Sequence, residues 1–213
     1  MTRNGDIHGT FAKRQWYTRG DVSIHSNPGD CWVVVFDRVI DLSELVKSDT
    51  IGSTVELVKV AGSDISHWFV QNDQSGLIEP KMVISKPGTS VAEPLGPLKP
   101  FMNFPWWRDD SLLVGHIASQ EQRIIIENML TGQRQSMIVP VDETLAEVSA
   151  RYLVGSNLHA NSYTWKRLGR PLLMSRTLTD NGVPNEGPKM SKLGLEEMIP
   201  VLHLYFNDDL TEA

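Results

Sequence analysis

The sequence predicts an α+β protein of two small domains joined by a proline-rich segment. A length of 213 residues allows two modest cores. The first half alternates strand patterns with short helical segments, and the second half has a hairpin, one amphipathic helix and a terminal apolar strand. We therefore expect an N-terminal tail (1–16), a first domain (17–75), a connecting strap (76–120), a second domain (121–207) and a C-terminal tail (208–213).

The charge balance favours protein partners over nucleic acid or lipid. Acidic residues outnumber basic ones by 26 to 20, which gives a formal net charge of -6 and offers no broad basic face for polyanions. The start, "MTRNGDIHGTFAKRQW", has no apolar region typical of a signal peptide, and no later segment approaches the ~20 apolar residues that cross a bilayer. We expect a soluble intracellular protein without nucleic-acid or membrane partners.

Cys31 is the single cysteine, so the chain has no internal disulfide. Its place in the apolar strand pattern "DCWVVV" favours a small buried hydrophobe. A redox-active or intermolecular thiol is the alternative.

The first domain begins with dense turn and strand signals. Turn residues at 27–30 precede a β-branched and aromatic run over 31–36, and a tight turn at Asp37-Arg38 leads to a second strand. Thr18 is placed to cap a short helical turn, and Asp64 is placed to cap the helically spaced segment "DISHWF".

The strap is rich in proline and glycine, which predicts an extended connector without a core of its own. It also contains Phe101, Phe104, Trp106 and Trp107. Each aromatic side chain buries on the order of 150–250 Å², so we expect the strap to lie either against a domain or against a partner.

The second domain reads as strand, turn, strand, helix. "RIIIEN" and "QSMIVPV" flank a Leu-Thr-Gly turn, after which Asp142 is expected to cap the helix "ETLAEVSARYLV". "SYTWKRL" predicts a strand that ends in a turn at Gly169, and a Gly/Pro-rich loop follows at 185–194. The last strand, "IPVLHLYF", is apolar enough to pair centrally in a mixed sheet that carries the helix on one face.

Residues 121–207 resemble the ubiquitin-like β-grasp family in the segments "MLTGQRQSMIVPVDETLAEV" and "GRPLLMSRTLTDNGV". The resemblance implies an interaction module. Conjugation is not expected, because the chain ends in "YFNDDLTEA" without a terminal Gly-Gly. Lys166 falls near the central aliphatic position of the ubiquitin binding patch, so ordinary ubiquitin receptors are not expected partners.

The first domain resembles the cytochrome b5-like family. Tyr17 to His25 begins the match, which continues through "DCWVVV", "RVIDLSELV" and "AGSDISHWF". In that family two imidazoles hold the haem iron from opposite faces. The two positions that would supply them fall near Asp49 and Gln74 in this chain, and neither is histidine.

His67 lies at a position that does not bind haem in the cytochrome b5 pattern. Three interpretations remain open: a histidine packed beside Trp68, a ligand in a remodelled pocket with Asp49 as the other haem position, and a partner contact.

The order of the two domains, with "PWWRDD" between them and "LHLYFNDDLTEA" at the end, resembles a family of axonemal radial-spoke proteins of motile cilia and flagella. That family combines a haem-binding domain with a cordon-bleu-like ubiquitin fold. The resemblance implies a non-enzymatic structural or regulatory subunit that contacts other radial-spoke proteins. A haem-binding redox sensor in the cilium is the alternative.

Enzymatic activity is not expected, because no convergent catalytic set is visible and the side chains of the adjacent residues Ser66 and His67 diverge. The aromatic residues Trp106, Trp107, Tyr205 and Phe206 are the candidate partner-binding side chains. Packing within the chain is the alternative for all four.

Overall fold

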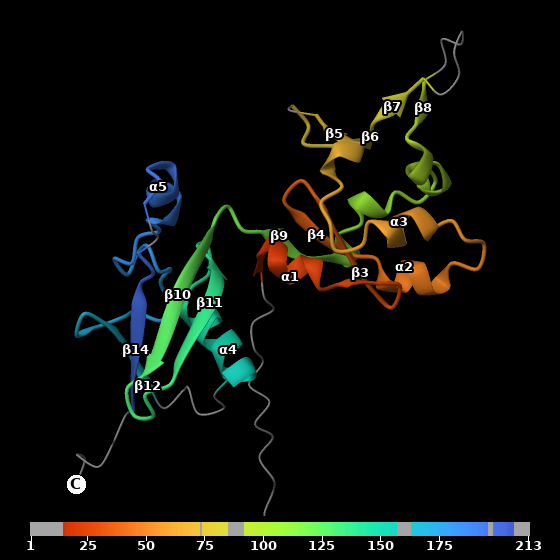
Figure 1. The fold of residues 1–213 in the computed structure, drawn as a ribbon. Coiled ribbons are helices and arrows are strands. Elements are labelled where there is room, and N and C mark those ends of the chain that lie inside the picture. Colours follow the sequence, from red (N-terminus) through yellow and green to blue (C-terminus); the bar gives the residue numbers. More distant parts are fainter. Residues whose placement is uncertain (1–14, 73, 85–91, 157–162, 196–197, 207–213) are drawn as a thin grey trace, which may run out of the picture. The chain divides into compact units, whose positions relative to one another are not determined.

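The structure is a computed structural model that describes residues 15–72, 74–84, 92–156, 163–195 and 198–206. It divides into two compact units, one of residues 15–119 and one that begins at Gln120 (Figure 1). Each unit has its own sheet and its own hydrophobic core. The α+β class that the sequence predicts is therefore observed in both.

The first domain contains nine short strands, three α-helices and four 3-10 helices within the described residues. In chain order they are β1 (Trp16–Tyr17), α1 (Arg19–Ser23), β2 (Ser26–Asn27), β3 (Asp30–Val35), β4 (Arg38–Asp41), α2 (Ser43–Ser48), α3 (Val55–Lys59), η1 (Ser66–Trp68), β5 (Phe69–Gln71), β6 (Ile78–Pro80), β7 (Met82–Val83), β8 (Glu93–Pro94), η2 (Gly96–Phe101), η3 (Trp106–Arg108), η4 (Asp110–Leu112) and β9 (Leu113–Ile117).

The main sheet of this domain has the strand order β1-β9-β4-β3-β2. Side chains of β3 alternate between two buried clusters: Cys31 and Val33 belong to the larger one, whereas Val34 belongs to a smaller one with Val22 of α1. Both faces of the strand are covered, which explains why "CWVVV" is apolar at successive positions.

The strap is not a connector, which corrects the expected domain boundaries. Its last strand, β9, lies inside the main sheet between β1 and β4. Gly115 permits this arrangement, because a Cβ there would come within 2.6 Å of the Gln15 carbonyl oxygen and 2.7 Å of the Tyr17 ring. Residues 15–119 therefore form one domain, and the described part of the strap up to Ser119 belongs to it.

The capping prediction at Thr18 is confirmed. Its hydroxyl accepts a hydrogen bond from the Asp21 backbone N–H at 3.0 Å, and Asp21 accepts one from the Thr18 N–H at 2.8 Å. This reciprocal pair satisfies backbone donors at the start of α1. The Asp64 carboxylate likewise accepts from the Ser66 N–H at 2.9 Å, although the segment that follows is the 3-10 helix η1.

The second domain contains β10 (Glu121–Asn128), β11 (Arg134–Pro140), α4 (Leu145–Ser156), β12 (Tyr163–Arg167), β13 (Arg170–Pro171), α5 (Gly187–Lys192) and β14 (Val201–Phe206). Its sheet has the order β11-β10-β14-β12-β13. β14 is central, parallel to β10 and antiparallel to β12, as its apolar sequence predicts.

The core of the second domain lies between one face of the sheet and α4. Leu145, Val148 and Tyr152 of α4 pack with inward side chains of the strands, including Ile124 and Trp165. Burial of this face leaves the opposite face of the sheet without a covering helix among the described elements (Figure 1). We call it the outer sheet face.

Two local predictions for this domain differ from the structure. The helix begins at Leu145, and the cap is Thr144, whose N–H and hydroxyl each donate to the Glu147 carboxylate at 2.8 Å. The prediction of Asp142 as the cap is therefore wrong. The expected loop at 185–194 contains α5, where Pro188 lies in the first turn, a position that its fixed φ favours.

No helix among the described residues is long and apolar enough to cross a membrane.

Trp107→Ala should destabilise the first domain strongly, because the side chain is only 1 % exposed and its removal leaves a cavity. We expect the free energy of unfolding to fall by about 3–5 kcal/mol in urea denaturation of the full chain. Phe104→Ala is the matched control, because Phe104 is 81 % exposed and should cost less than about 0.5 kcal/mol. Equal losses in the two variants would contradict this packing.

Candidate functional site

Trp106 and Trp107 lie inside the first domain, only 3 % and 1 % exposed. Their ring centroids are 5.5 Å apart, and those of Phe69 and Trp107 are also 5.5 Å apart. Such edge and tilted contacts are typical of packed aromatic cores. The prediction that these two tryptophans contact a partner is wrong, and the alternative of packing within the chain is what the structure shows.

The same segment does expose a neighbouring aromatic. Phe104 is 81 % exposed, beside the 45 % exposed Met102. Phe104 borders an open groove of about 690 Å³ on the first domain, with Leu45, Pro105 and Leu112 among its other lining residues. The buried tryptophans thus support a turn that presents Phe104 to solvent.

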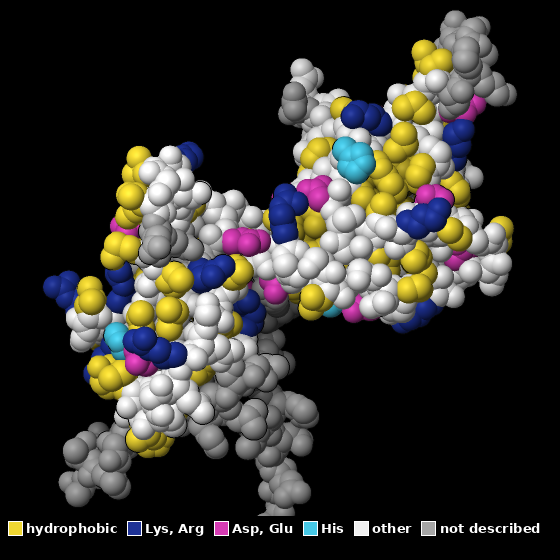
Figure 2. All heavy atoms as spheres, in the orientation of Figure 1, with side chains coloured by type: hydrophobic (Ala, Val, Ile, Leu, Met, Phe, Trp, Pro, Cys, Tyr) yellow, Lys and Arg dark blue, Asp and Glu magenta, His cyan; other side chains and the backbone are white. Residues whose placement is uncertain are grey.

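A second hollow of about 230 Å³ shares Pro105 and Arg108 with this groove and adds Met82 and Met102. Arg108 Nε donates to the Ile78 carbonyl oxygen at 3.0 Å, which fixes the side chain between the two hollows. Figure 2 shows hydrophobic side chains gathered on this domain between β6 and the turns after β8. The Phe104 surface, as we call it, consists of Leu45, Met82, Met102, Phe104, Pro105 and Leu112.

Tyr205 and Phe206 are exposed at the end of β14, by 37 % and 49 %. They point to opposite faces of the sheet, because successive strand residues alternate. Tyr205 is on the outer sheet face, whereas Phe206 packs edge-on against Tyr163 with ring centroids 5.5 Å apart. The two side chains therefore do not form one surface, and only Tyr205 belongs to the outer face.

A row of charged side chains crosses the outer sheet face. The strand register aligns Arg134, Glu127, His203 and Lys166 across four neighbouring strands. Arg134 Nη2 is 2.9 Å from the Glu127 carboxylate, and its hydrogen bond lowers the pKa of that carboxyl group. His203 Nε2 lies 3.6 Å from the same carboxylate. Lys166 Nζ lies 4.6 Å from the centroid of the Tyr205 ring, a cation-π contact.

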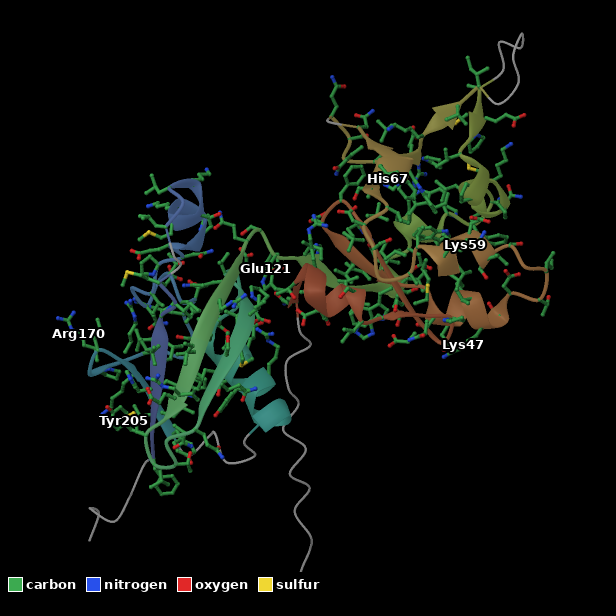
Figure 3. The ribbon with its side chains drawn as sticks, viewed as in Figure 1. Lys47, Lys59, His67, Glu121, Arg170 and Tyr205 are labelled. Atoms are coloured by element: carbon green, nitrogen blue, oxygen red, sulfur yellow. The ribbon has the colours of Figure 1, made fainter. Side chains whose placement is uncertain are left out.

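The two candidate haem positions are not brought together. In Figure 3, His67 lies beside β5, whereas Lys47 of α2 lies on the other side of the first domain. Asp49 directly follows α2 and therefore lies near Lys47. The His67 side chain is exposed, and its ring meets Trp68 edge-on with centroids 6.0 Å apart. This contact matches the interpretation of a histidine packed beside Trp68.

Asp49 has a structural role in the loop before α3. Its carboxylate accepts hydrogen bonds from the N–H groups of Thr54, Ile51 and Gly52, at 2.5, 3.0 and 3.0 Å. The hydrogen bond from Thr54 is the main cause that lowers the pKa of Asp49. These bonds occupy the oxygens that a metal ligand would need.

Cys31 is fully buried, as the strand pattern predicts. Burial and, secondarily, the nearby charges of Asp41 and Asp30 raise the pKa of its thiol to about 11. The thiol therefore stays protonated at neutral pH, which disfavours redox chemistry because the thiolate is the reactive form.

Comparisons with known proteins find full-length relatives. The chain is 37% identical over 218 residues to cytochrome b5 domain-containing protein 1 of Xenopus tropicalis, covering 93% of this chain and 97% of the relative. It is 35% identical over 228 residues to the Homo sapiens protein of the same name, covering 100% of both chains. The chain belongs to the cytochrome b5 domain-containing protein 1 family.

Two further matches are partial, and no family model matches the chain. Delta(8)-fatty-acid desaturase 2 of Arabidopsis thaliana is 33% identical over 58 residues, which is 27% of this chain and 13% of that protein. The solution structure of the ubl5 domain from the polyubiquitin locus of T. thermophila aligns with a TM-score of 0.31 at 15% identity, covering 40% of this chain and 93% of that domain.

The family name raises the question of whether this chain has residues that could hold a haem iron. A bis-imidazole site needs two neutral nitrogen ligands on opposite faces of the iron. At the two candidate positions this chain has a hydrogen-bonded carboxylate, Asp49, and an exposed histidine, His67. Within the described residues, no group of three or more His, Cys, Asp and Glu side chains could hold a metal ion. These residues do not fit an axial ligand pair.

Two residues that are each 81 % exposed, Phe104 and Leu168, are absent from the partner-binding side chains that the sequence predicts. Phe104 lies in the aromatic-rich strap, for which the sequence left packing against a domain and contact with a partner open, and only Trp106 and Trp107 of this segment were selected as candidates. Leu168 precedes Gly169 in "KRLGR", where a leucine occupies a turn position that usually holds Asn, Asp or Gly. This unusual residue at a turn position is the sequence feature that could have indicated Leu168.

His67→Ala should not change the spectrum of the chain with haemin. After incubation and desalting, we expect the wild type and the variant to give equal absorbance in the Soret region, because the exposed imidazole of His67 has no second axial ligand at Asp49. A Soret band that survives desalting in the wild type and disappears in the variant would contradict this expectation.

Asp49→Asn should make stability less dependent on acid pH. The hydrogen bonds to the Asp49 carboxylate lower its pKa in the folded chain, below the ordinary value of about 3.9. The free energy of unfolding that this difference in pKa contributes is fully present when the pH is above the ordinary pKa of the carboxyl group. It is lost as the pH falls through the lower pKa of the folded chain. Melting temperatures across the acid range should therefore fall less steeply for the variant, and parallel curves would contradict this role.

Proposed function

We propose that the chain is a non-enzymatic structural and regulatory subunit of the ciliary or flagellar axoneme, a radial-spoke component that takes part in ciliary beating. The resemblance of the whole chain to the axonemal radial-spoke family supports this proposal. The partners are other axonemal proteins, which the subunit contacts through both domains. The chain acts in the axoneme, within a reducing compartment.

The Phe104 surface carries the docking part of the proposal. An exposed phenylalanine beside exposed methionines, at the edge of a groove of about 690 Å³, presents apolar area to solvent in the described part of the first domain. Contact with a protein would remove this area from water at roughly 25 cal/mol per Å². Aromatic and methionine side chains are also enriched where proteins bind one another.

The geometry around Ser66 and His67 supports a role without catalysis. Ser66 Oγ accepts a hydrogen bond from the Phe36 N–H at 2.6 Å and donates to the Asp64 carboxylate. The hydroxyl thus connects η1 to the turn after β3. A serine nucleophile would instead need a base positioned to accept its proton, and His67 has no such bond with Ser66 among the described contacts.

The alternative function, a haem-binding redox sensor of the cilium, would need ligands other than Asp49 and His67. No observation on the described residues favours it over docking.

Phe104→Ser should reduce incorporation of the chain into axonemes. Tagged wild type and variant would be expressed in ciliated cells, and the fraction retained on detergent-extracted axonemes measured. We expect the variant to lose about tenfold or more of its retention, since removing an interface aromatic costs on the order of 2 kcal/mol. Beat frequency would report the regulatory part of the proposal.

Ile51→Ser is the matched control, because Ile51 is 89 % exposed and does not line the groove. Its retention should equal that of the wild type. Absence of the wild-type chain from extracted axonemes would refute the axonemal assignment, whereas equal losses for both variants would refute docking through the Phe104 surface.

A further inference from the structure

Leu168 combines an exposed apolar side chain with an unfavourable backbone conformation. It is 81 % exposed, and its φ of 48° places it in the left-handed region, directly before Gly169 at φ 77°. A non-glycine residue in this region costs of the order of 1 kcal/mol, and aliphatic side chains are poorly suited to it. Strained residues of this kind cluster at binding sites, so Leu168 directs attention to its surroundings.

Leu168 lines a groove of about 350 Å³ beside the start of β14. The apolar lining comes from Met198, Ile199, Pro200 and Val201, and Met198 is itself 70 % exposed. Arg134, Arg167 and His203 line the same groove. The lining of the groove thus combines apolar side chains with two arginines, one histidine and Glu186.

The cations around this groove are held in place. Arg134 is bonded to Glu127, and Arg167 Nη1 donates to the Gly182 carbonyl oxygen at 2.8 Å. Lys166 is fixed by its contact with the Tyr205 ring at 4.6 Å. Because these side chains are already ordered, binding through them loses less conformational entropy than binding through free arginines and lysines.

Several cations on this part of the domain lack an acidic partner. Among the described residues, Arg123, Lys166 and Arg170 form no ion pair. Arg123 is exposed on β10, on the outer sheet face. Figure 3 labels Arg170 at the edge of the sheet that β13 forms.

Two acidic residues, Glu127 and Glu186, lie near the groove within the described residues. Glu127 is paired with Arg134, and Glu186 lines the groove. Glu196 and Glu197 precede Met198 in the sequence but lie outside the described residues. Arg134 and Arg167 thus line the groove together with Glu186, and the cations without an ion pair lie on neighbouring parts of the same sheet, in a chain whose net charge is -6.

We propose that this surface binds an acidic segment of a protein partner, which packs an aliphatic side chain against Leu168 and Val201 and places carboxylates beside Arg134, Lys166 and Arg123. The proposal deepens the docking role proposed above by naming the partner chemistry on the second domain. A protein segment fits better than a phosphate backbone, because Leu168, Met198 and Val201 line the groove and an aliphatic side chain between the carboxylates can pack against them.

The test uses the full chain and two fluorescent 12-residue peptides of our design, one of alternating Asp/Glu and Leu and one with Lys in place of each acid. Fluorescence anisotropy in low and high salt gives the affinities. Phosphatidylserine vesicles and single-stranded RNA are the competing probes. We expect the acidic peptide to bind about tenfold or more tightly than the basic one, and to weaken in high salt.

Leu168→Asn separates binding from folding. Asparagine tolerates the left-handed region better than leucine, so the melting temperature should stay equal or rise while affinity for the acidic peptide falls about tenfold. Lys166→Glu should weaken binding by a similar factor. Lys189→Glu on α5, an exposed lysine outside the groove, is the matched charge control and should leave the affinity unchanged.

The proposal is overturned if the basic peptide binds as well as the acidic one, if Leu168→Asn and Lys166→Glu bind like the wild type, or if vesicles or RNA bind more tightly with the same dependence on these residues. Because this measurement uses purified protein, it does not depend on axonemes. Peptide binding without axonemal retention would refute only the function proposed above, and retention without peptide binding would refute only this inference.

Discussion

Burial of Trp106 and Trp107 against Phe69 is the packing interaction on which the first domain depends. It connects η3 to β5 within one core that also includes Leu57 of α3. The same contact orients the segment that continues through η4 into β9. The indole pair therefore holds the returning chain against the sheet at the point where β9 enters it, and the exposed position of Phe104 follows from this anchoring.

The sequence predicts those parts of the fold that are encoded locally. β3 is visible as a β-branched run, Thr18 as a cap, and β14 as an apolar strand with a central place in its sheet. The strap was misinterpreted because frequent proline and glycine are typical of linkers. Here these residues form 3-10 turns, which need few backbone hydrogen bonds but still position Trp106 and Trp107 for burial. Pairing of β1 with β9 joins distant segments and has no local signature.

The candidate surfaces were predictable in composition but not in geometry. Sequence reasoning selected aromatic side chains in the strap and at the end of β14, and exposed aromatic side chains do occur in both segments. Which ones are exposed depends on tertiary packing: Phe104 faces solvent while Trp106 does not, and strand alternation separates Tyr205 from Phe206. Asp49 seemed available as a ligand because the sequence does not reveal that its carboxylate is bonded to three backbone N–H groups.

The central place of β9 has a consequence for biosynthesis. β3 and β4 leave the ribosome early, but the strand that completes the sheet beside β4 is the last element of the domain. At ~5–20 residues per second, the edge of β4 waits on the order of several seconds for its partner. During that interval β4, with its apolar residues Val39 and Ile40, carries unpaired backbone groups along one edge, a state prone to aggregation. The nascent chain thus has a period of exposure that ends only when β9 emerges and pairs with β4.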